Sequence, residues 1–430
     1  MKYIHAIFIL FLINALSTVR AQERLSLSEC YQLARENYPQ IHQLGLINQS
    51  EQYKLGNIGK GWLPQLAIKA EATFQSDVTK LPFDEKQFSS LIPEGNIPIL
   101  NKDQYRVVAQ LDQTIWDGGK IRASKALTHA QARAQREQVE SELYTLRKRV
   151  NDLFFGCLLQ EELIGQNIIL QKDLRNNIER VRSMITNGVA NQSDLESLQV
   201  ELLNAHQQEI ELRAEQKAFR EMLGLFLHKD LDEKTIFSLP ELPEQLGNAA
   251  VNRPELRVLT AKNDILQNQR RLLNAGLMPR FSAFLQGGYG RPALDMLSND
   301  FEGYYVAGIR VSWNFGKLYT LKNERKGIQA NQKMIDRQKQ TFLFNTDLQL
   351  IQQQTEIEKM KKLMKADEEI IRLRTSIQKS AEVKLENGMI AVTDLIREIN
   401  AADLSRQKAT MHHIQHLMNV YNLLYITNRE

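Results

Sequence analysis

The distribution of proline constrains the fold of this 430-residue chain more than any other sequence feature. All ten prolines lie within residues 39–98 and 240–292, so residues 99–239 and 293–430 contain none. Proline interrupts a helix because it lacks an N–H group and its ring clashes with the preceding turn. Two uninterrupted tracts of 141 and 138 residues therefore predict two long helical segments.

Apolar residues in the first tract recur at the spacing of a helix seam. From Val139 to Ile185 they follow one another mostly at steps of three or four residues, or at sums of these steps. A helix from Gly119 to Thr186 would be about 100 Å long, at about 1.5 Å per residue. That length exceeds the depth of a compact domain, so we expect the helix to pack against other helices along its length.

Each tract contains one turn with the same pattern. The sequence NGVANQSDL at 187–195 matches NGMIAVTDL at 387–395. In both, the Asn-Gly pair can adopt the left-handed conformation that commonly ends a helix. After each turn we expect a return helix, which runs to about residue 222 in the first hairpin and about residue 426 in the second. In the first turn, Ser193 and Glu196 predict a capping box. The patterns predict two helical hairpins with their tips at 187–195 and 387–395.

Further matched motifs indicate an internal duplication. NYPQI at 37–41 matches NRPEL at 252–256, LPQL at 63–66 matches MPRF at 278–281, and WDGGK at 116–120 matches WNFGK at 313–317. We divide the chain into a signal peptide at 1–21, a first repeat at 22–247 and a second repeat at 248–430. Each repeat would contain short helical structure, two strands and a long hairpin, and the proline-rich segment at 81–100 lengthens the first.

The first 21 residues have the pattern of an export signal. Lys2 precedes an apolar run from Ala6 to Leu16, and Val19 and Ala21 provide the small residues that signal peptidase recognises. We expect cleavage after Ala21. The alternative is an N-terminal membrane anchor, which is disfavoured because the run is shorter than the ~20 apolar residues of a spanning helix.

Between the helices the pattern changes to the alternation of β-strands. Apolar residues alternate with mostly polar ones at about 66–74, 105–115, 281–289 and 305–313. When the repeats are aligned, the apolar phase of the second and fourth strands differs by one residue, which requires a bulge or a slip near 113–117. Segments of about ten residues with one apolar face are typical of a membrane β-barrel. After the signal, we expect no helix apolar enough to span a membrane.

Aromatic residues lie at both ends of the predicted strands, as they do at the two interfaces of a membrane. Trp62, Trp116 and Trp313 mark the ends that meet helices, and Phe74, Tyr105, Tyr289, Tyr304 and Tyr305 lie near the opposite ends. The alternative is that these rings pack in the corner of a soluble β-sandwich. Since the smallest membrane barrels have about eight strands, four strands per chain predict a dimer or a trimer.

Composition and motifs favour no enzyme, cofactor or nucleic-acid partner. The formal net charge is +4, and it falls to +2 when Lys2 and Arg20 leave with the signal, which is too balanced to indicate an anionic partner. No nucleophile elbow, phosphate-binding loop or HExxH motif is present. His412 and His416 have the spacing of two metal ligands, but the sequence shows no neighbouring acid, so we expect no metal site.

The two cysteines, Cys30 and Cys157, are far apart in the sequence. An exported protein could join them in a disulfide, or both could lie on apolar helix faces. We favour the second interpretation, and the sequence leaves both open.

The ordered set of motifs resembles the TolC-like outer-membrane efflux proteins. The resemblance rests on IWDGGK at 115–120 with its echo WNFGK, on the two tips, and on the repeated order of helix, strand, strand and hairpin. It implies a mainly α fold with a small β part. Four membrane strands per protomer would contribute to a trimeric twelve-stranded β-barrel, the duplicated hairpins would form a periplasmic α-barrel, and residues 225–247 would form a belt around its middle.

The resemblance also implies a function. Family members are passive outer-membrane channels of tripartite efflux or type I secretion systems, which work with a periplasmic adaptor protein and an inner-membrane pump and need no cofactor. It implies adaptor docking at Gly188, Val189, Gly388 and Met389, and a periplasmic gate at Ser193, Asp194, Thr393, Asp394 and Arg397.

The aspartates of the tips have two interpretations. Relatives with an aspartate gate carry a second acid where this chain has Arg397, so Asp394 and Arg397 could neutralise each other. Both Asp194 and Asp394 could instead serve only as helix caps that pair with the helix dipole.

Two other classes of protein remain as alternatives. A soluble periplasmic coiled-coil scaffold explains the helices but leaves the strands and the aromatic ends without a role. An outer-membrane barrel enzyme would need a Ser/His/acid set that faces one lumen, and none is apparent in the sequence. The sequence identifies neither the transported substrate nor the energy source of the pump.

Overall fold

The structure is a computed structural model that describes residues 24–79, 101–243, 251–296 and 298–428. It contains two compact units. The hairpin unit comprises the described parts of 1–44, 137–258 and 338–430, and the sheet unit comprises those of 45–136 and 259–337. Each unit therefore draws on both proposed repeats. The predicted signal peptide, the insertion at 81–100 and the repeat boundary at 247–248 lie outside the described residues.

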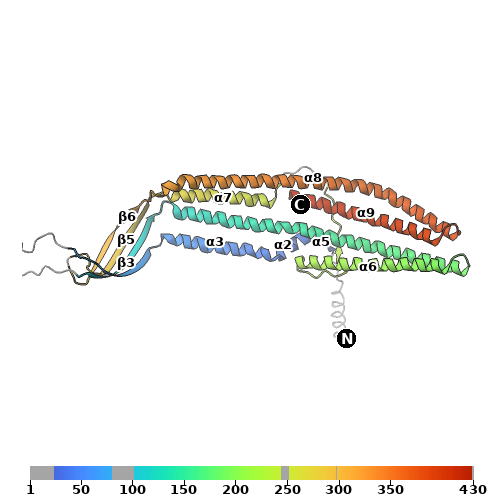
Figure 1. The fold of residues 1–430 in the computed structure, drawn as a ribbon, viewed down its shortest axis with the longest axis horizontal. Coiled ribbons are helices and arrows are strands. Elements are labelled where there is room, and N and C mark those ends of the chain that lie inside the picture. The colour runs from blue at the N-terminus through green and yellow to red at the C-terminus, as the bar shows by residue number, and fades with distance from the viewer. Residues whose placement is uncertain (1–23, 80–100, 244–250, 297, 429–430) are drawn as a thin grey trace, which may run out of the picture. The chain divides into compact units, whose positions relative to one another are not determined.

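Long helices dominate the chain, as the proline-free tracts predicted (Figure 1). α5 (Lys120–Thr186) and α6 (Gln192–Leu227) form the first hairpin, and α8 (Lys317–Glu386) and α9 (Val392–Thr427) form the second. α5 has 67 residues and α8 has 70. The hairpin turns lie where they were expected, and α6 continues five residues beyond the predicted end at 222.

Shorter helices precede the strands in both halves of the chain. They are α2 (Leu27–Asn37), η2 (Pro39–His42), α3 (Gln43–Gly59), η3 (Lys60–Trp62) and α7 (Pro254–Ala275). Ser26 begins α2 with a capping box, because its Oγ accepts from the N–H of Glu29 at 3.3 Å and Glu29 Oε2 accepts from the N–H of Ser26 at 2.9 Å. The Ser26 N–H and the Ser26 hydroxyl, which donates to Glu29 Oε2 at 2.8 Å, both lower the pKa of Glu29.

The four predicted strands form one antiparallel sheet in the order β2-β3-β5-β6. They are β2 (Gln65–Phe74), β3 (Asp103–Trp116), β5 (Arg280–Arg291) and β6 (Glu302–Ser312). Within the described residues, the outer edges of β2 and β6 pair with no other strand. The sheet is therefore open, and both of its edge strands present unpaired backbone groups.

The strand register confirms the predicted phase of the sheet. Leu111 lies opposite both Leu66 and Leu285, and opposite residues of neighbouring strands project from the same face. The apolar face carries Leu66, Ile68, Ala70, Ala72, Phe74, Tyr105, Val107, Ala109, Leu111, Phe281, Ala283, Leu285, Tyr289, Tyr305, Ala307, Ile309 and Val311. The polar residues Asp103, Gln113 and Arg291 share this face near the strand ends. The mostly polar face carries Gln65, Ala67, Lys69, Glu71, Thr73, Arg106, Val108, Gln110, Asp112, Phe284, Gln286, Gly288, Tyr304, Val306, Gly308 and Arg310.

A β-bulge explains the one-residue difference in phase between the repeats. The register of β3 against β5 shifts between Thr114 and Trp116, so that Ile115 is left unpaired and Trp116 lies opposite Phe281. This is the irregularity that the sequence required near 113–117. Because of the extra residue, the apolar alternation at the end of β3 agrees again with that of the matching strand of the second repeat, β6.

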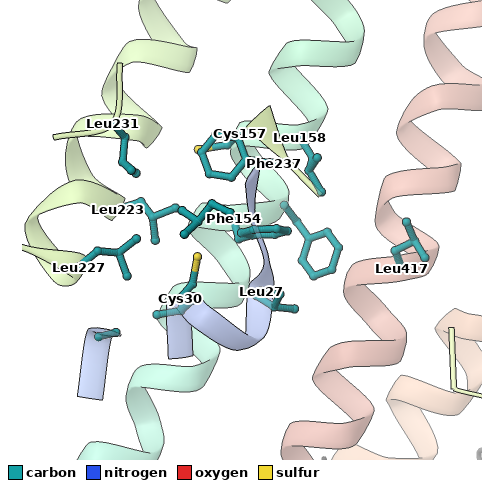
Figure 2. Close-up of a cluster of buried hydrophobic side chains, with 14 of the residues drawn as sticks. Leu27, Cys30, Phe154, Cys157, Leu158, Leu223, Leu227, Leu231, Phe237 and Leu417 are labelled. Carbon is teal, nitrogen blue, oxygen red and sulfur yellow. The ribbon is translucent and has the colours of Figure 1, made fainter. Parts of the chain in front are cut away.

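A core of buried side chains joins five segments of the hairpin unit (Figure 2). The labelled residues in Figure 2 are Leu27, Cys30, Phe154, Cys157, Leu158, Leu223, Leu227, Leu231, Phe237 and Leu417. Phe237 belongs to β4 (Ile236–Phe237), which pairs in parallel with β1 (Arg24–Leu25). Arg220 of α6, which is also buried, donates to the backbone oxygens of Asp232 and Thr235. The described part of the predicted belt, up to residue 243, is thus attached to this core.

Among the described helices, α5 contains an 18-residue window that is apolar enough by composition to span a membrane. The sequence-based expectation that no such helix follows the signal is therefore wrong by this test. However, 44% of the window is buried inside the chain, and α5 contributes Val150, Phe154 and Phe155 to the core. A helix in a protein core needs the same kind of apolar run, so this burial accounts for part of the composition.

The structure has Cys30 and Cys157 as free thiols, both fully buried in the core. Burial raises the pKa of each thiol to about 12, so the reactive thiolate is nearly absent at neutral pH. We expect neither thiol to react with a maleimide in the folded protein, and both to react after denaturation without reductant. Intact-mass measurement checks this. Denatured protein that takes up label only after reduction would show a disulfide instead.

Candidate functional site

The tips of the two hairpins share one core in the hairpin unit, and Figure 1 shows both turns at the same end of that unit. All four long helices contribute buried residues: Leu174, Ile178, Val181, Leu195, Leu198, Ala381, Leu385, Leu395 and Ile399. An ion pair adds to this packing, because Arg180 of α5 lies 3.7 Å from Glu382 and 3.6 Å from Glu386 of α8. The two tips are therefore presented side by side as one surface.

Both turns have the backbone geometry that the Asn-Gly pairs predicted. Gly188 has a φ of +73° and Gly388 has a φ of +67°, which are left-handed values. In the first turn, the N–H of Gly188 donates to the C=O of Ile185 at 3.0 Å and the N–H of Val189 donates to the C=O of Met184 at 2.9 Å. This pair of bonds is a Schellman motif.

The second turn repeats the motif. The N–H groups of Gly388 and Met389 donate to the C=O groups of Leu385 and Lys384, each at 2.9 Å. The last carbonyls of α5 and α8 are therefore satisfied in the same way. The echo between the two sequences reproduces the same local structure twice.

The residue after each glycine is an apolar side chain that faces solvent. Val189 is 60% exposed and Met389 is 71% exposed. Neither side chain contributes to the core beneath the tips. Apolar side chains at adjacent, exposed turns have no packing role within the chain, and paired exposure of this kind is typical of a contact surface.

The two tip aspartates act as helix caps, which is one of the two roles considered for them. Asp194 Oδ2 accepts from the N–H of Asn191 at 3.0 Å, and Asp394 Oδ2 accepts from the N–H of Ala391 at 3.3 Å. Each aspartate is the third residue of its helix, from which a carboxylate reaches back to the N-cap. The capping box predicted for Ser193 and Glu196 is wrong, because α6 begins at Gln192 with Asn191 as its N-cap.

The remaining residues considered for the gate are exposed and balanced in charge. Ser193 and Thr393 are exposed at the beginning of α6 and α9. Arg397 lies 3.4 Å from Asp394, as the sequence suggested, and 3.3 Å from Glu398. Arg397 offsets part of the negative charge of the Asp394 carboxylate, and a cation beside the carboxylate does not favour capture of a second cation.

His412 has an acidic neighbour that the sequence did not reveal. Its Nδ1 lies 2.7 Å from Oδ2 of Asp367, which is 45 residues away on α8. His416, one turn further along α9, is buried, and burial lowers its pKa. The described residues contain no group of three or more His, Cys, Asp or Glu side chains that could hold a metal ion. The contact between His412 and Asp367 therefore links α8 to α9.

The predicted aromatic residues lie at the two ends of the sheet. Trp62 precedes β2, Trp116 ends β3 and Trp313 follows β6, and all three are more than 40% exposed. At the opposite strand ends, Phe74 is 79% exposed and Tyr305 is 77% exposed. The packed corner of a soluble sandwich would bury such rings, so their exposure favours a surrounding apolar medium.

Sequence reasoning missed several aromatic residues that join those at the two ends of the sheet, which we call the two aromatic belts. Phe301 stacks with Tyr105 and Tyr289, with ring centroids 6.4 Å and 5.9 Å apart. At the other end, Phe281 lies 5.7 Å from Trp116, and Phe315 lies 4.7 Å from Trp313. Phe301 and Phe315 lie just outside the strands, where alternation gives no signal, so only their closeness to the strand ends could have indicated them.

Comparison with known proteins agrees with this geometry. A model of the outer membrane efflux protein family matches residues 30–225. The outer-membrane channel OprN has 11% sequence identity and a TM-score of 0.69, covering 94% of this chain and 90% of that one. The outer membrane protein VceC of Vibrio cholerae has 12% identity and a TM-score of 0.65, covering 94% and 96%. No curated protein matches the chain.

The open-state structure of the MtrE outer membrane channel of Neisseria gonorrhoeae is similar as well. It has 14% identity and a TM-score of 0.66, covering 94% of this chain and 89% of that one. The solved structures have the same fold as this chain, and the family model also matches its sequence over residues 30–225. Together they confirm the resemblance to the TolC-like outer membrane efflux proteins.

The Schellman turns make a prediction about stability. Replacing Gly188 or Gly388 by Val places a β-branched residue at a left-handed position, which costs about 1–2 kcal/mol or more. We expect a lower midpoint of denaturant unfolding for each variant, with the fold retained. Asn is the matched control because it tolerates this conformation, so Gly188→Asn and Gly388→Asn should lose much less. Equal losses for Val and Asn would contradict the backbone explanation.

Proposed function

We propose that this protein is the outer-membrane channel of a tripartite efflux or type I secretion system, and that it works as a homotrimer. The observation that carries the proposal is the open four-stranded sheet. Its apolar face is exposed, with Ile68 70% and Ile309 73% exposed, and aromatic side chains flank that face at both strand ends. An apolar face bounded by two aromatic belts fits a lipid bilayer.

Three copies of the sheet would make a closed barrel. Within lipid every backbone polar group needs a partner, so the free edges of β2 and β6 cannot remain open. The four strands alternate in direction, so β2 and β6 run in opposite directions. β6 of one copy can therefore pair antiparallel with β2 of the next. Three copies give twelve strands, and the resemblance to the TolC-like family supports three rather than two.

The polar face of the sheet would then line the lumen. It carries ion pairs between Arg106 and Glu71, at 2.7 Å, and between Arg310 and Asp112, at 3.5 Å. Charged side chains are tolerated there because the lumen holds water. The lining is balanced in charge and does not identify a substrate.

The exposed tip surface would dock a periplasmic adaptor, which connects the channel to an inner-membrane pump. Val189 and Met389 supply its apolar part, and Gly188 and Gly388 shape the turns that present them. Ser193, Asp194, Thr393, Asp394 and Arg397 would surround the periplasmic mouth. Asp194 and Asp394 could both cap their helices and take part in gating. Each cap is a hydrogen bond within one tip, so it would persist when the tips move.

The alternative of a soluble periplasmic scaffold is not favoured. It leaves the sheet, with its exposed apolar face and two aromatic belts, without a role. Cell fractionation separates the two functions: a channel sediments with outer membranes and is released only by detergent. Recovery in the periplasmic supernatant would support the scaffold.

The two faces of the sheet should differ in their tolerance of charge. Lys at Ile68 or Ile309 should cost about 2–4 kcal/mol, because each side chain would face lipid near mid-membrane. Lys at Thr73 or Gln286, on the polar face, should have a mild effect. Yield of assembled protein in the outer membrane and its resistance to urea measure the difference. Equal tolerance on both faces would show that the sheet is not oriented as proposed.

Docking at the tips predicts a loss of transport without a loss of assembly. Val189→Asp and Met389→Asp should abolish most efflux, because an adaptor would have to desolvate the new carboxylates. The control Gln192→Asp adds the same charge at the first turn of α6, where the helix dipole stabilises it. Cargo efflux is measured beside yield in the outer membrane. If Val189→Asp and Met389→Asp both support full efflux, these two side chains do not take part in docking.

A further inference from the structure

The polar face of the sheet contains two cross-strand pairs of a glycine and an aromatic residue. Gly288 of β5 lies opposite Tyr304 of β6, and Phe284 of β5 lies opposite Gly308 of β6. Opposite residues project from the same face, so both rings belong to the face that would line the lumen. Tyr304 and Phe284 are nevertheless partly buried.

The rings occupy the space above the glycines. A Cβ atom added to Gly288 would lie 2.5 Å from Cε1 and from Oη of Tyr304, far inside contact distance. A Cβ added to Gly308 would lie 3.1 Å from Cε1 and 3.2 Å from Cζ of Phe284. Both rings therefore lie flat along the sheet. Phe284 is also covered by the guanidinium of Arg310, 4.6 Å from its ring centroid.

The backbone does not explain these glycines. Neither Gly288 nor Gly308 has a positive φ, so their extended conformations are open to any residue. Glycine weakens a strand because it has no side chain to pack and loses more entropy on folding. At position 288 the ring of Tyr304 is the feature that requires glycine. At position 308 a Cβ atom would need the Phe284 ring to move by only a small distance.

The other face of the same strand pair supplies an internal comparison. Gly287 lies opposite Tyr305 on the apolar face, one residue away from the pair of Gly288 and Tyr304. A Cβ added to Gly287 would meet nothing within 4 Å, and Tyr305 is 77% exposed. The same two residue types thus adopt opposite arrangements: the ring stands away from the sheet on the lipid side and lies against it on the polar side.

We infer that Gly288 helps to determine the width of the bore, by allowing Tyr304 to lie against the barrel wall and not project into the lumen. This inference rests on the proposed channel function, in which the polar face lines the lumen. A trimer would place three copies of the Tyr304 ring around the bore. Any side chain at position 288 forces the Tyr304 ring to rotate away from the wall, and the water-filled space is the direction left open to it.

Single-channel conductance of the purified protein in planar lipid bilayers tests this inference. Gly288→Ala should lower the conductance, because the displaced Tyr304 ring obstructs the bore. The double variant Gly288→Ala/Tyr304→Ala should restore it, since no ring remains to be displaced. Gly287→Ala is the matched control and should conduct like the unmodified protein, because its added methyl group faces lipid.

Tyr304→Ala alone provides a test that does not depend on assembly of the Gly288 variant. A ring that already lies on the wall can be removed with little change in conductance, whereas a ring that projects into the bore would give a large increase when removed. That increase, or unchanged conductance of assembled Gly288→Ala, overturns the inference. If the unmodified protein forms no channels, the proposed function itself fails. Conducting protein that is insensitive to Gly288→Ala rejects only the role of Gly288.

Discussion

The unpaired edges of the β2-β3-β5-β6 sheet are the constraint on which the rest of the structure depends. An exposed strand edge is a liability in water and is excluded from the hydrocarbon of a membrane, where each free N–H and C=O group costs several kcal/mol. The chain cannot close the sheet on itself with four strands. In the proposed channel, the apolar face would lie against lipid and the edges of β2 and β6 would pair with other copies of the chain. Oligomerisation would then satisfy the backbone groups at both edges.

The hairpin unit meets a different requirement, which is to present two turns together. Four helices share the core beneath the tips, and the same Schellman bonds and aspartate caps end and begin the helices in both hairpins. These devices hold Val189 and Met389 in exposed positions that bury nothing within the chain. Rigid helices that end in apolar turns are well suited to bind a partner, because little entropy is lost when the surface is already ordered.

Much of this fold is readable from the sequence because its strongest signals are local. Proline-free tracts, Asn-Gly turns and strict alternation place the long helices and the strands to within a few residues, and the required bulge lies at Ile115. The errors concern choices that local patterns do not decide. Ser193 and Asn191 are both good N-caps, and the register of the turn selects Asn191. The neighbour of His412 is Asp367 on another helix, and the ring of Tyr304 over Gly288 depends on strand pairing, so neither contact has a local signature.

Cross-linking of the sheet edges tests closure by three copies most directly. Double variants would carry one cysteine in β2, at Ala70 or Ala72, and one in β6, at Ala307; all three positions lie on the apolar face. The native thiols are buried and do not interfere. With a bifunctional thiol reagent in outer membranes, the account predicts covalent species that end at a trimer on denaturing gels. A series that ends at a dimer, or no cross-linking between β2 and β6, would contradict the account.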